Sequence, residues 1–329
     1  MEIAFPGGRE IICKAFKNQG IPERAILTSL SSIGDSTQKS YEGALKKWWI
    51  YCKEKGLELY NPKIAQVMEF LSKQYQGVLS HSSLNIIRSA ISLITPNAIA
   101  EDPRMKRFFK GISKERPSRP KYDYTWNPKD VLDYFSTKPH NEKLELKDLS
   151  YKLVTLLALV TGHRIQTLSL IKITNILISD SKIEIMIPDP IKTSRKGVRQ
   201  PLLCLPYFKE NLKICPASAL ICYLNATKSI RGPINNLFIS INSNVKAVGK
   251  QTLSNWVKHV LKSSGIDTTI FSSHSVRHAS TSAANRSRLN VNVILQTAGW
   301  SENTATFARF YNRELIKDKS EFAMSILNQ

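Results

Sequence analysis

Four short motifs in the second half of the chain contain the residue types that can attack and stabilise an anionic ester. They read Thr161-Gly-His-Arg164, His274-Ser-Val-Arg277-His278, Ala298-Gly-Trp300 and Phe310-Tyr311. Cutting a phosphodiester without a metal needs fixed cations for the non-bridging oxygens, a proton carrier, and a nucleophile that can hold the broken end. Arginine, histidine and tyrosine supply these three parts, so the motifs favour phosphoryl transfer.

Each of these residues also has a plainer interpretation. Alone, His274 would be a hydrogen-bonded core histidine, Tyr311 a half-buried aromatic residue, and Trp300 an ordinary core residue. The two arginines favour the chemical interpretation, because arginine is rarely placed beside apolar runs such as residues 153–160 unless an anion pairs with it. Neither arginine motif contains a carboxylate. A phosphate, which a guanidinium can grip with two parallel hydrogen bonds, fits both.

Taken in order, the motifs resemble the active site of the tyrosine recombinase (phage integrase) superfamily. The resemblance implies that Tyr311 attacks a DNA phosphate while other residues stabilise the developing charge: Arg164, Arg277, His274 and Trp300. It also implies a 3′-phosphotyrosine intermediate, two-step strand transfer without ATP, and no metal or other cofactor. His163 and His278, which neighbour the two arginines, are interpreted as structural.

The superfamily carries a lysine in a basic turn between two strands, and this lysine protonates the departing 5′ oxygen. Residues 191–197 form such a turn here, and we assign the role to Lys192, with Lys196 as the rival. The alternative is a solvated turn lysine, since this loop differs in length from the commoner bacterial pattern.

A narrower resemblance is to eukaryotic mobile-element recombinases of the crypton and DIRS type. It depends on Phe5-Pro-Gly-Gly-Arg9, on Trp48-Trp49 and on Gln166-Thr-Leu168, and it implies a crypton-like transposase. The chain departs from the wider superfamily at Thr167, which replaces an acidic residue, and at Trp300, where many relatives have histidine. Tryptophan can donate one N–H to a phosphate but cannot carry protons. The interval from Trp300 to Tyr311 is also slightly long.

The charge balance favours a nucleic-acid partner. The 329 residues contain 47 Lys and Arg against 26 Asp and Glu, a formal charge of +21, which favours a polyanion through counterion release. Double-stranded DNA is the expected partner. An anionic membrane surface is the alternative, but the sequence shows no apolar run of spanning length and no anchored basic helix.

The cysteines and the basic clusters bear on the compartment. The five cysteines show no Cys-x-x-Cys spacing, their odd number disfavours a disulfide framework, and no secretory leader is recognisable. We therefore expect an intracellular chain. The basic cluster of Arg104, Lys106, Arg107 and Lys110 is compatible with a nuclear import signal, although such runs more often face DNA or solvent. We expect a nuclear location.

The apolar patterning predicts a mainly α-helical protein with a small antiparallel β-sheet. Helices are expected near residues 36–51, 64–75 and 82–93 as a small bundle, and at 148–160, 166–171, 216–227 and 251–261 in a second domain. Strands are expected at residues 176–178, 182–187 and 200–205. The expected boundaries are an N-terminal extension at 1–27, a helical core-binding domain at 28–111, a basic linker at 112–126 and a catalytic domain at 127–329. By resemblance, the two domains form a C-shaped clamp around DNA.

Residues 104–121 carry most of the expected DNA contacts. Pro117 and Pro120 are expected to break any helix there, and a solvated linker is the plainer interpretation. The DNA-binding candidates are Arg104, Lys106, Arg107, Lys110, Lys114, Arg116, Arg119 and Lys121, with Lys46 and Lys47 from the bundle.

Two rival functions remain open at this point. A type IB topoisomerase shares the nucleophile but relaxes DNA as a monomer, and a domesticated DNA-binding protein would have lost catalysis. We favour the recombinase because every expected catalytic residue type is present. We expect a monomer in solution and a homodimer or homotetramer on DNA. The resemblance implies that the protomers are joined by a C-terminal tail in which Leu315, Phe322 and Ile326 share one helical face. Packing of this tail against its own domain is the alternative.

Overall fold

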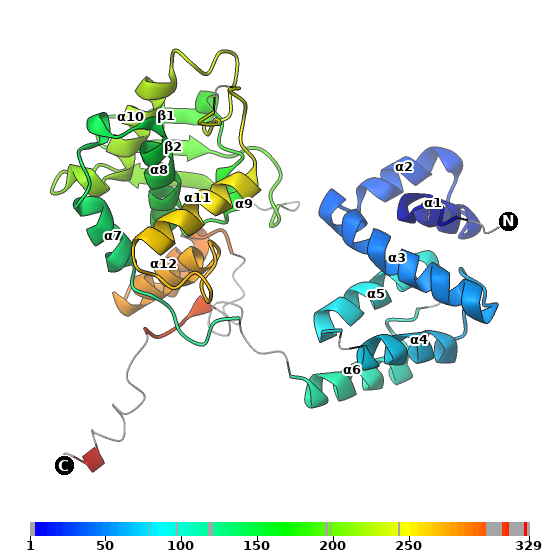
Figure 1. Ribbon diagram of the computed structural model, residues 1–329. Coiled ribbons are helices and arrows are strands. Elements are labelled where there is room, and N and C mark those ends of the chain that lie inside the picture. The colour runs from blue at the N-terminus through cyan, green and yellow to red at the C-terminus, as the bar shows by residue number, and fades with distance from the viewer. Residues whose placement is uncertain are drawn as a thin grey trace. The chain divides into compact units, whose positions relative to one another are not determined.

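The chain divides into two compact units, residues Met1–Arg119 and Pro120–Gln329, in the computed structural model (Figure 1). The structure describes residues 4–77, 79–96, 98–117, 121–194, 197, 199–242, 244–300, 311–315 and 326–327. In this part of the chain, no helix combines the length and the apolar character that crossing a bilayer requires.

The first unit is an all-helical bundle around one core. Its helices are α1 (Gly8–Asn18), α2 (Glu23–Ser31), α3 (Asp35–Lys55), α4 (Ile64–Gln76), α5 (His81–Ile94) and α6 (Pro103–Glu115). Trp48 of α3 lies at the centre with 0% exposure, and its ring centroid is 5.1 Å from that of Phe70 on α4. The expected helices near residues 36–51, 64–75 and 82–93 are confirmed.

The expected N-terminal extension at residues 1–27 is not what the structure contains. Helices α1 and α2 belong to the bundle, because Ile11, Ile12 and Phe16 of α1 and Leu30 of α2 are buried in the same core as Trp48. In α1, the apolar pair Ile11–Ile12 is followed four residues later by the pair Ala15–Phe16. This is the helical spacing of a buried face.

The expected linker at residues 112–126 is divided between the two units. Helix α6 continues to Glu115 and buries Met105, Phe109 and Ile112, so most of the basic segment is the exposed face of a helix. Further along the chain, Tyr122 and Trp126 are buried in the core of the second unit. Helix α6 therefore forms and ends shortly before Pro117.

The second unit combines helices with a three-stranded sheet. Its helices are α7 (Pro128–Ser136), α8 (Leu146–Thr161), α9 (Ile165–Leu168), α10 (Pro216–Thr227), α11 (Lys250–Ser263), α12 (Ser275–Arg286) and α13 (Val291–Thr297). Short 3-10 turns lie at Asn141–Lys143, Ile173–Asn175 and Leu212–Ile214. The expected helices are confirmed, although α9 is shorter than the predicted residues 166–171.

Helix α8 is the central element of this unit. Its apolar residues are buried around most of its circumference, as Leu153, Val154, Leu156 and Leu157 show, and such a helix must be enclosed by other elements. It packs against α10, α11 and α12 (Figure 1). Its C-terminal end is therefore fixed inside the unit, and Arg164 follows directly after it.

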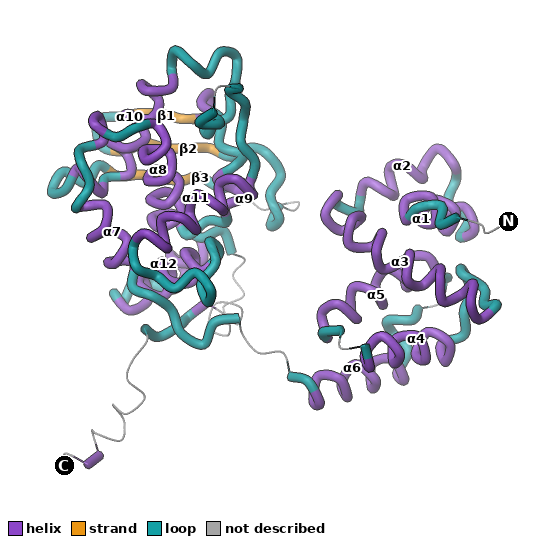
Figure 2. The backbone as a smooth tube through the Cα atoms, viewed as in Figure 1, coloured by secondary structure: helices purple, strands orange, loops and turns teal. Residues whose placement is uncertain are grey.

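The strands β1 (Ile176–Ile178), β2 (Lys182–Met186) and β3 (Leu202–Pro206) form an antiparallel sheet in the order β1-β2-β3 (Figure 2). The register places Ile183 opposite Leu205 and Ile185 opposite Leu203, and these four side chains form the buried face. The mainly α fold class with a small antiparallel sheet is thereby confirmed. The β2–β3 connection contains Lys192.

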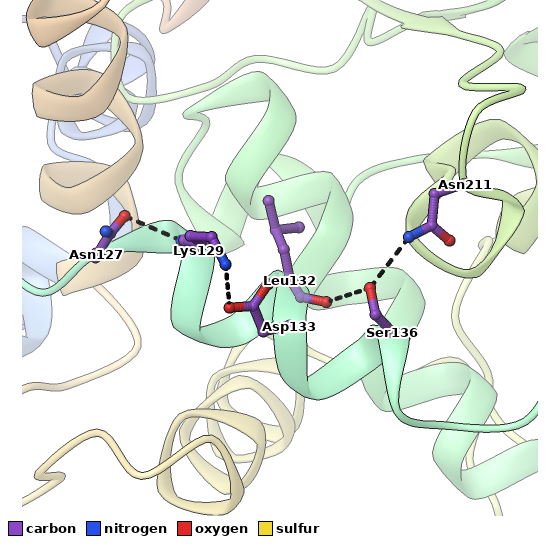
Figure 3. Close-up of polar contacts among 6 residues, drawn as sticks. All are labelled: Asn127, Lys129, Leu132, Asp133, Ser136 and Asn211. Atoms are coloured by element: carbon purple, nitrogen blue, oxygen red, sulfur yellow. Dashed lines mark hydrogen bonds and ion pairs between the residues drawn. The ribbon is translucent and has the colours of Figure 1, made fainter.

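Helix α7 begins the helical part of the second unit. Asn127 accepts a hydrogen bond from the Lys129 amide at 3.1 Å, and Pro128 occupies the first turn (Figure 3). At the other end, Ser136 Oγ donates to Leu132 O at 3.0 Å and accepts from Asn211 Nδ2 at 3.2 Å. These bonds join α7 to the segment that precedes α10.

Candidate active site

Arg277 is the most buried charged residue among those that the motifs identified. It is 2% exposed, and its Nη1 donates to Gly162 O at 2.5 Å and to Ala298 O at 2.6 Å. Gly162 caps the C-terminus of α8 and Ala298 caps that of α13, where unpaired carbonyls carry partial negative charge. One guanidinium therefore joins two of the motifs by binding two helix ends.

Arg277 has two further donors that the helix ends do not use. Its Nε and Nη2 are buried and have no well-aligned acceptor among the described residues, and the Trp300 ring lies 3.8 Å from its Cζ. No carboxylate of the described chain lies within ion-pair distance of Arg277 or Arg164. A buried cation in this condition is costly unless an anion binds it.

Two glycines allow the close packing that brings the motifs together. Gly162 has a φ of +59°, and a Cβ on it would touch Ala298 and Thr281 at 3.4 Å. Gly299 has a φ of +66°, and a Cβ there would lie 2.8 Å from His163 Cε1. His163 thus packs under the Ala-Gly-Trp turn, which supports its interpretation as structural.

Tyr311 lies within this cluster. Its hydroxyl is 3.3 Å from His274 Nε2, and its ring centroid is 4.6 Å from that of Trp300. The Arg277 Cζ is 5.5 Å from the Tyr311 ring. The structure therefore brings together Tyr311, His274, Arg277 and Trp300, which are more than thirty residues apart at the extremes of the sequence.

The electrostatics of the cluster are strongly positive. Burial first, and then repulsion from Arg277, Arg164, Lys121 and Lys192, lowers the pKa of His274 to about 4. Burial and repulsion from Arg164 lower the pKa of Arg277 to about 9, against an opposing effect of Tyr311. At neutral pH, His274 is therefore neutral and Arg277 charged. Although the His274 side chain is exposed on one side, its low pKa fits a ring that faces several cations.

Arg164 and Lys192 lie at the edge of this cluster. Arg164 is half-buried at the N-terminal cap of α9, close enough to repel Arg277, His274 and His163. Lys192 is exposed in the β2–β3 connection and contributes to the low pKa of His274. Lys196, the rival to Lys192, lies outside the described residues.

Lys121 was predicted as a linker residue, yet it lies beside the candidate active site. Its Nζ donates to Ser272 Oγ at 3.4 Å, and its charge also lowers the pKa of His274. The neighbouring Tyr122 hydroxyl is 2.7 Å from Ser272 Oγ, and Trp126 Nε1 donates to Ser275 Oγ at 2.9 Å. The start of this unit thus supports the turn that carries His274, a role that no sequence motif indicated.

His278 and Ser282 are further contacts of Tyr311. The His278 ring stacks on the Tyr311 ring at 4.3 Å, and Ser282 Oγ donates to Tyr311 O at 2.6 Å. The sequence analysis treated His278 as structural and did not consider Ser282. The signal was the four-residue spacing of positions 274, 278 and 282, which lie on one face of a helix.

Other expected DNA contacts already have protein partners. Arg104 pairs with Asp102 at 2.8 Å and Lys106 with Glu101 at 2.7 Å, while Arg116 lies 4.0 Å from the centre of the Tyr75 ring. Arg119 falls outside the described residues. Five candidates are exposed and make neither an ion pair nor a side-chain hydrogen bond or ring contact with described residues: Lys46, Lys47, Arg107, Lys110 and Lys114.

Chemically, the cluster can bind a diester phosphate between Arg164 and the remaining donors of Arg277. The Tyr311 hydroxyl would then be the nucleophile nearest to the phosphorus. A neutral His274 can accept the tyrosine proton in the tautomer that leaves Nε2 unprotonated.

Comparisons with known proteins identify a family for most of the second unit. The model of the phage integrase family matches residues 129–316. A comparison with curated proteins found no match.

Three solved structures share the fold. The XerH site-specific recombinase bound to palindromic difH, in a post-cleavage complex, has a TM-score of 0.62 and 18% identity, covering 98% of this chain and 89% of that one. A tyrosine-to-phenylalanine variant of the Tn1549 transposon integrase, in complex with transposon right-end DNA, has a TM-score of 0.58 and 16% identity. The match covers 98% of this chain and 100% of that one. A lambda integrase fragment, solved as a dimer bound to a COC′ core site, has a TM-score of 0.53 and 17% identity. The match covers 89% of this chain and 94% of that one.

Proposed function

Because the chain belongs to the phage integrase family, we propose that it cuts and rejoins double-stranded DNA through a 3′-phosphotyrosine intermediate. The observation that carries the proposal is the position of the Tyr311 hydroxyl, 3.3 Å from His274 Nε2 and beside the buried, incompletely paired Arg277. The fold relatives described above are DNA recombinases and integrases, which supports the same substrate class.

In the proposed cleavage step, Tyr311 Oη attacks the phosphorus and the bond to the 5′ oxygen breaks. The tyrosine proton passes to His274, and Lys192 Nζ gives a proton to the departing 5′ oxygen. Arg164, Arg277 and the Trp300 N–H stabilise the charge on the non-bridging oxygens. The phosphotyrosine keeps the bond energy, so a 5′ hydroxyl from a partner strand can reverse the step without ATP.

The test is covalent capture on DNA. The probe is a pool of short duplexes with a randomised interior, nicked so that cleavage releases a small fragment and rejoining is prevented. We expect the wild-type chain to form an adduct that survives SDS, and sequencing of the captured DNA would identify the preferred site. Tyr311→Phe keeps the ring and removes the attacking oxygen, so it should bind DNA and form no adduct. An adduct with the Phe variant would refute the assignment.

Arg164→Ala is the companion variant, because Arg164 is half-buried and makes no bond that closes the core. Loss of a charge-stabilising donor costs about 2.7–4 kcal/mol, or roughly a hundredfold or more in rate. Adduct formation should therefore slow far more than binding weakens. Arg277→Ala is less informative, since it also removes the bonds to two helix ends.

Covalent capture combined with assays of supercoil relaxation and of joining to a second duplex separates the rivals. A type IB topoisomerase would form the adduct and relax supercoiled DNA without joining two duplexes, whereas a DNA-binding protein without catalysis would form no adduct. We extend the proposal to transposition of a crypton-like element, which rests only on the residues near positions 5–9, 48–49 and 166–168, and to a nuclear location, which rests on the basic cluster near residue 107. Joining of captured ends to a second duplex would support that extension.

A further inference from the structure

Helix α12 presents a row of side chains to the segment that begins with Tyr311. His274 caps the helix, and His278, Ser282 and Arg286 follow at intervals of four residues. Such intervals place side chains on one helical face. The row therefore runs along the helix as a continuous docking surface.

The row contacts both the ring and the backbone of the segment. The Tyr311 ring stacks on His278 at 4.3 Å with an interplanar angle of 20°, while its hydroxyl reaches His274. Ser282 Oγ donates to Tyr311 O at 2.6 Å and accepts from the Arg313 amide at 2.9 Å. Ser282 thus fixes the backbone on either side of Asn312.

Further bonds extend the docking beyond Ser282. Asn285 Nδ2 lies 3.1 Å from Asn312 Oδ1, and Arg286 Nη1 donates to Arg313 O at 3.2 Å. On its other side, the segment pairs with the start of the same unit, where the Thr125 amide donates to Glu314 O at 2.8 Å. Residues 311–315 are therefore held by their own chain from two directions.

His278 is itself fixed, so it can define the position of the ring that stacks on it. It is 8% exposed, and the Tyr122 ring meets it edge-on at 5.1 Å. With one face of the Tyr311 ring covered by His278 and Trp300 at its edge, the hydroxyl is directed towards His274. The stack limits the ring orientations that the nucleophile can adopt.

We propose that His278 and Ser282 are positioning residues that hold the Tyr311 hydroxyl in the orientation needed for attack. The inference rests on the proposed function. Its physical basis is that a reacting atom must be within a narrow range of distance and angle, and a displacement of about 1 Å can cost a hundredfold in rate. Losing one element of the docking row misplaces Tyr311 without changing the phosphate-binding arginines.

Ser282→Ala removes both backbone bonds and keeps the volume nearly constant. We expect the single-turnover rate of adduct formation on the nicked duplex pool to fall by about tenfold or more, with DNA affinity unchanged. Ser282→Thr retains the hydroxyl and should recover most of the rate. Thermal melting of each variant shows whether folding has been affected.

The matched control is Ser280→Ala on the same helix. Ser280 Oγ donates to Leu159 O and faces away from the Tyr311 segment. It should lower stability in a similar way and leave the adduct rate within about twofold of wild type. Equal rates for Ser282→Ala and wild type, or an equal fall in both alanine variants, would overturn the positioning role.

Two substitutions of His278 distinguish a role in stacking from a role in proton transfer. His278→Phe retains a flat ring for stacking, so it should lose less rate than His278→Leu, and its pH profile should keep the wild-type form. If the two variants lose the same rate and the pH profile changes, His278 carries a proton and the positioning role is wrong.

The wild-type result keeps this inference apart from the proposed function. Absence of any adduct with wild type would contradict the proposed function itself. A wild-type adduct that Ser282→Ala forms at the same rate would contradict the positioning role alone.

Discussion

At the scale of single residues, the site is organised by Arg277, a buried cation that has no carboxylate partner in the described chain. Arg277 satisfies two helix ends with one nitrogen and leaves two buried donors without a well-aligned acceptor in the described chain. The sequence predicted that Arg277 would bind a phosphate but not that it would also join α8 to α13. A sequence does not show which side chain donates to the backbone carbonyls at a helix end. This second role of Arg277 could therefore be found only in the structure.

The role of Lys192 can be separated from that of the other cations by changing the leaving group. Replacing the bridging 5′ oxygen of the scissile phosphate by sulfur gives a thiolate leaving group, which has a pKa of about 8.5 and needs no proton donor. We expect Lys192→Ala to be slow on ordinary DNA and to recover on the sulfur-substituted DNA. Tyr311→Phe should remain inactive on both.

If Lys192→Ala is not rescued by the sulfur substitution, Lys192 is not the general acid. Lys196→Ala, tested on the same two substrates, then becomes the direct comparison between the rival residues.

His163 gives the fold a dependence on pH. Burial first, then repulsion from Arg277 and Arg164, lowers its pKa to about 4, from about 6.5 in an unfolded chain. Between these two values the unfolded chain binds a proton that the folded chain refuses, so stability is lost as the pH falls. We expect the melting temperature to drop between about pH 6.5 and about pH 4.

The control for this pH dependence is His163→Asn, which cannot protonate. It should be less stable at neutral pH because the packing under Gly299 is lost, but its melting temperature should fall less steeply with acid. Parallel curves for the two proteins would assign the acid sensitivity to other groups.

At the scale of elements, patterning predicted those helices whose apolar stripe is regular. Helices α3, α4, α5, α8, α10 and α11 and all three strands lie where the alternation or the helical repeat placed them. Helix α6 was missed because eight basic residues and two prolines dominate its region, although Met105, Phe109 and Ile112 have helical spacing. The basic residues correctly indicated the exposed face of α6, but they distracted from the apolar spacing that forms its buried face.

The exposed face of α6 is the surface on which non-specific DNA affinity can be tested. Arg107, Lys110 and Lys114 lie three and four residues apart and make no ion pair within the described chain. Replacing Lys110 and Lys114 by Gln should lower the slope of log affinity against log salt by about 0.9 for each lost phosphate contact. The measurement is binding to duplex DNA at several salt concentrations.

The control pair on the same helix is Arg104 and Lys106. These residues already pair with Asp102 and Glu101, so replacing them by Gln should change the salt slope less. A slope that stays constant when Lys110 and Lys114 are replaced would mean that this face is only solvated. Arg116 is less suitable for the test, since it is stacked on Tyr75 and donates to Tyr75 O.

At the scale of the whole molecule, the chain has two separately packed units with different surface and site properties. The bundle presents Lys46 and Lys47 on α3 and the basic face of α6, while the second unit contains the candidate chemistry. Residues 121–126 belong to the second unit and contact both the His274 turn and the segment after Tyr311. The start of the second unit is therefore part of the support of the active site.

Assembly on DNA is the property that the C-terminal tail should control. Leu315 forms an isolated β-bridge with Thr125 of its own chain, which fixes the start of the tail to the second unit. Of the residues predicted to form an apolar face, Phe322 lies outside the described part of the chain, and Ile326 is 53% exposed. A short amphipathic helix is marginal alone and must bury its apolar face against protein.

Truncation after Lys317 keeps the Leu315 contact and removes the rest of the tail. We expect a monomer in solution with or without the truncation, and a dimer or tetramer on DNA only with the complete chain. Light scattering and gel mobility on duplexes with one or two captured sites would measure both states. Single-site binding by the truncated chain serves as the internal control, because the docking of Tyr311 on α12 is retained. Higher-order complexes at full stoichiometry after truncation would show that the tail packs on its own unit and that other surfaces join the protomers.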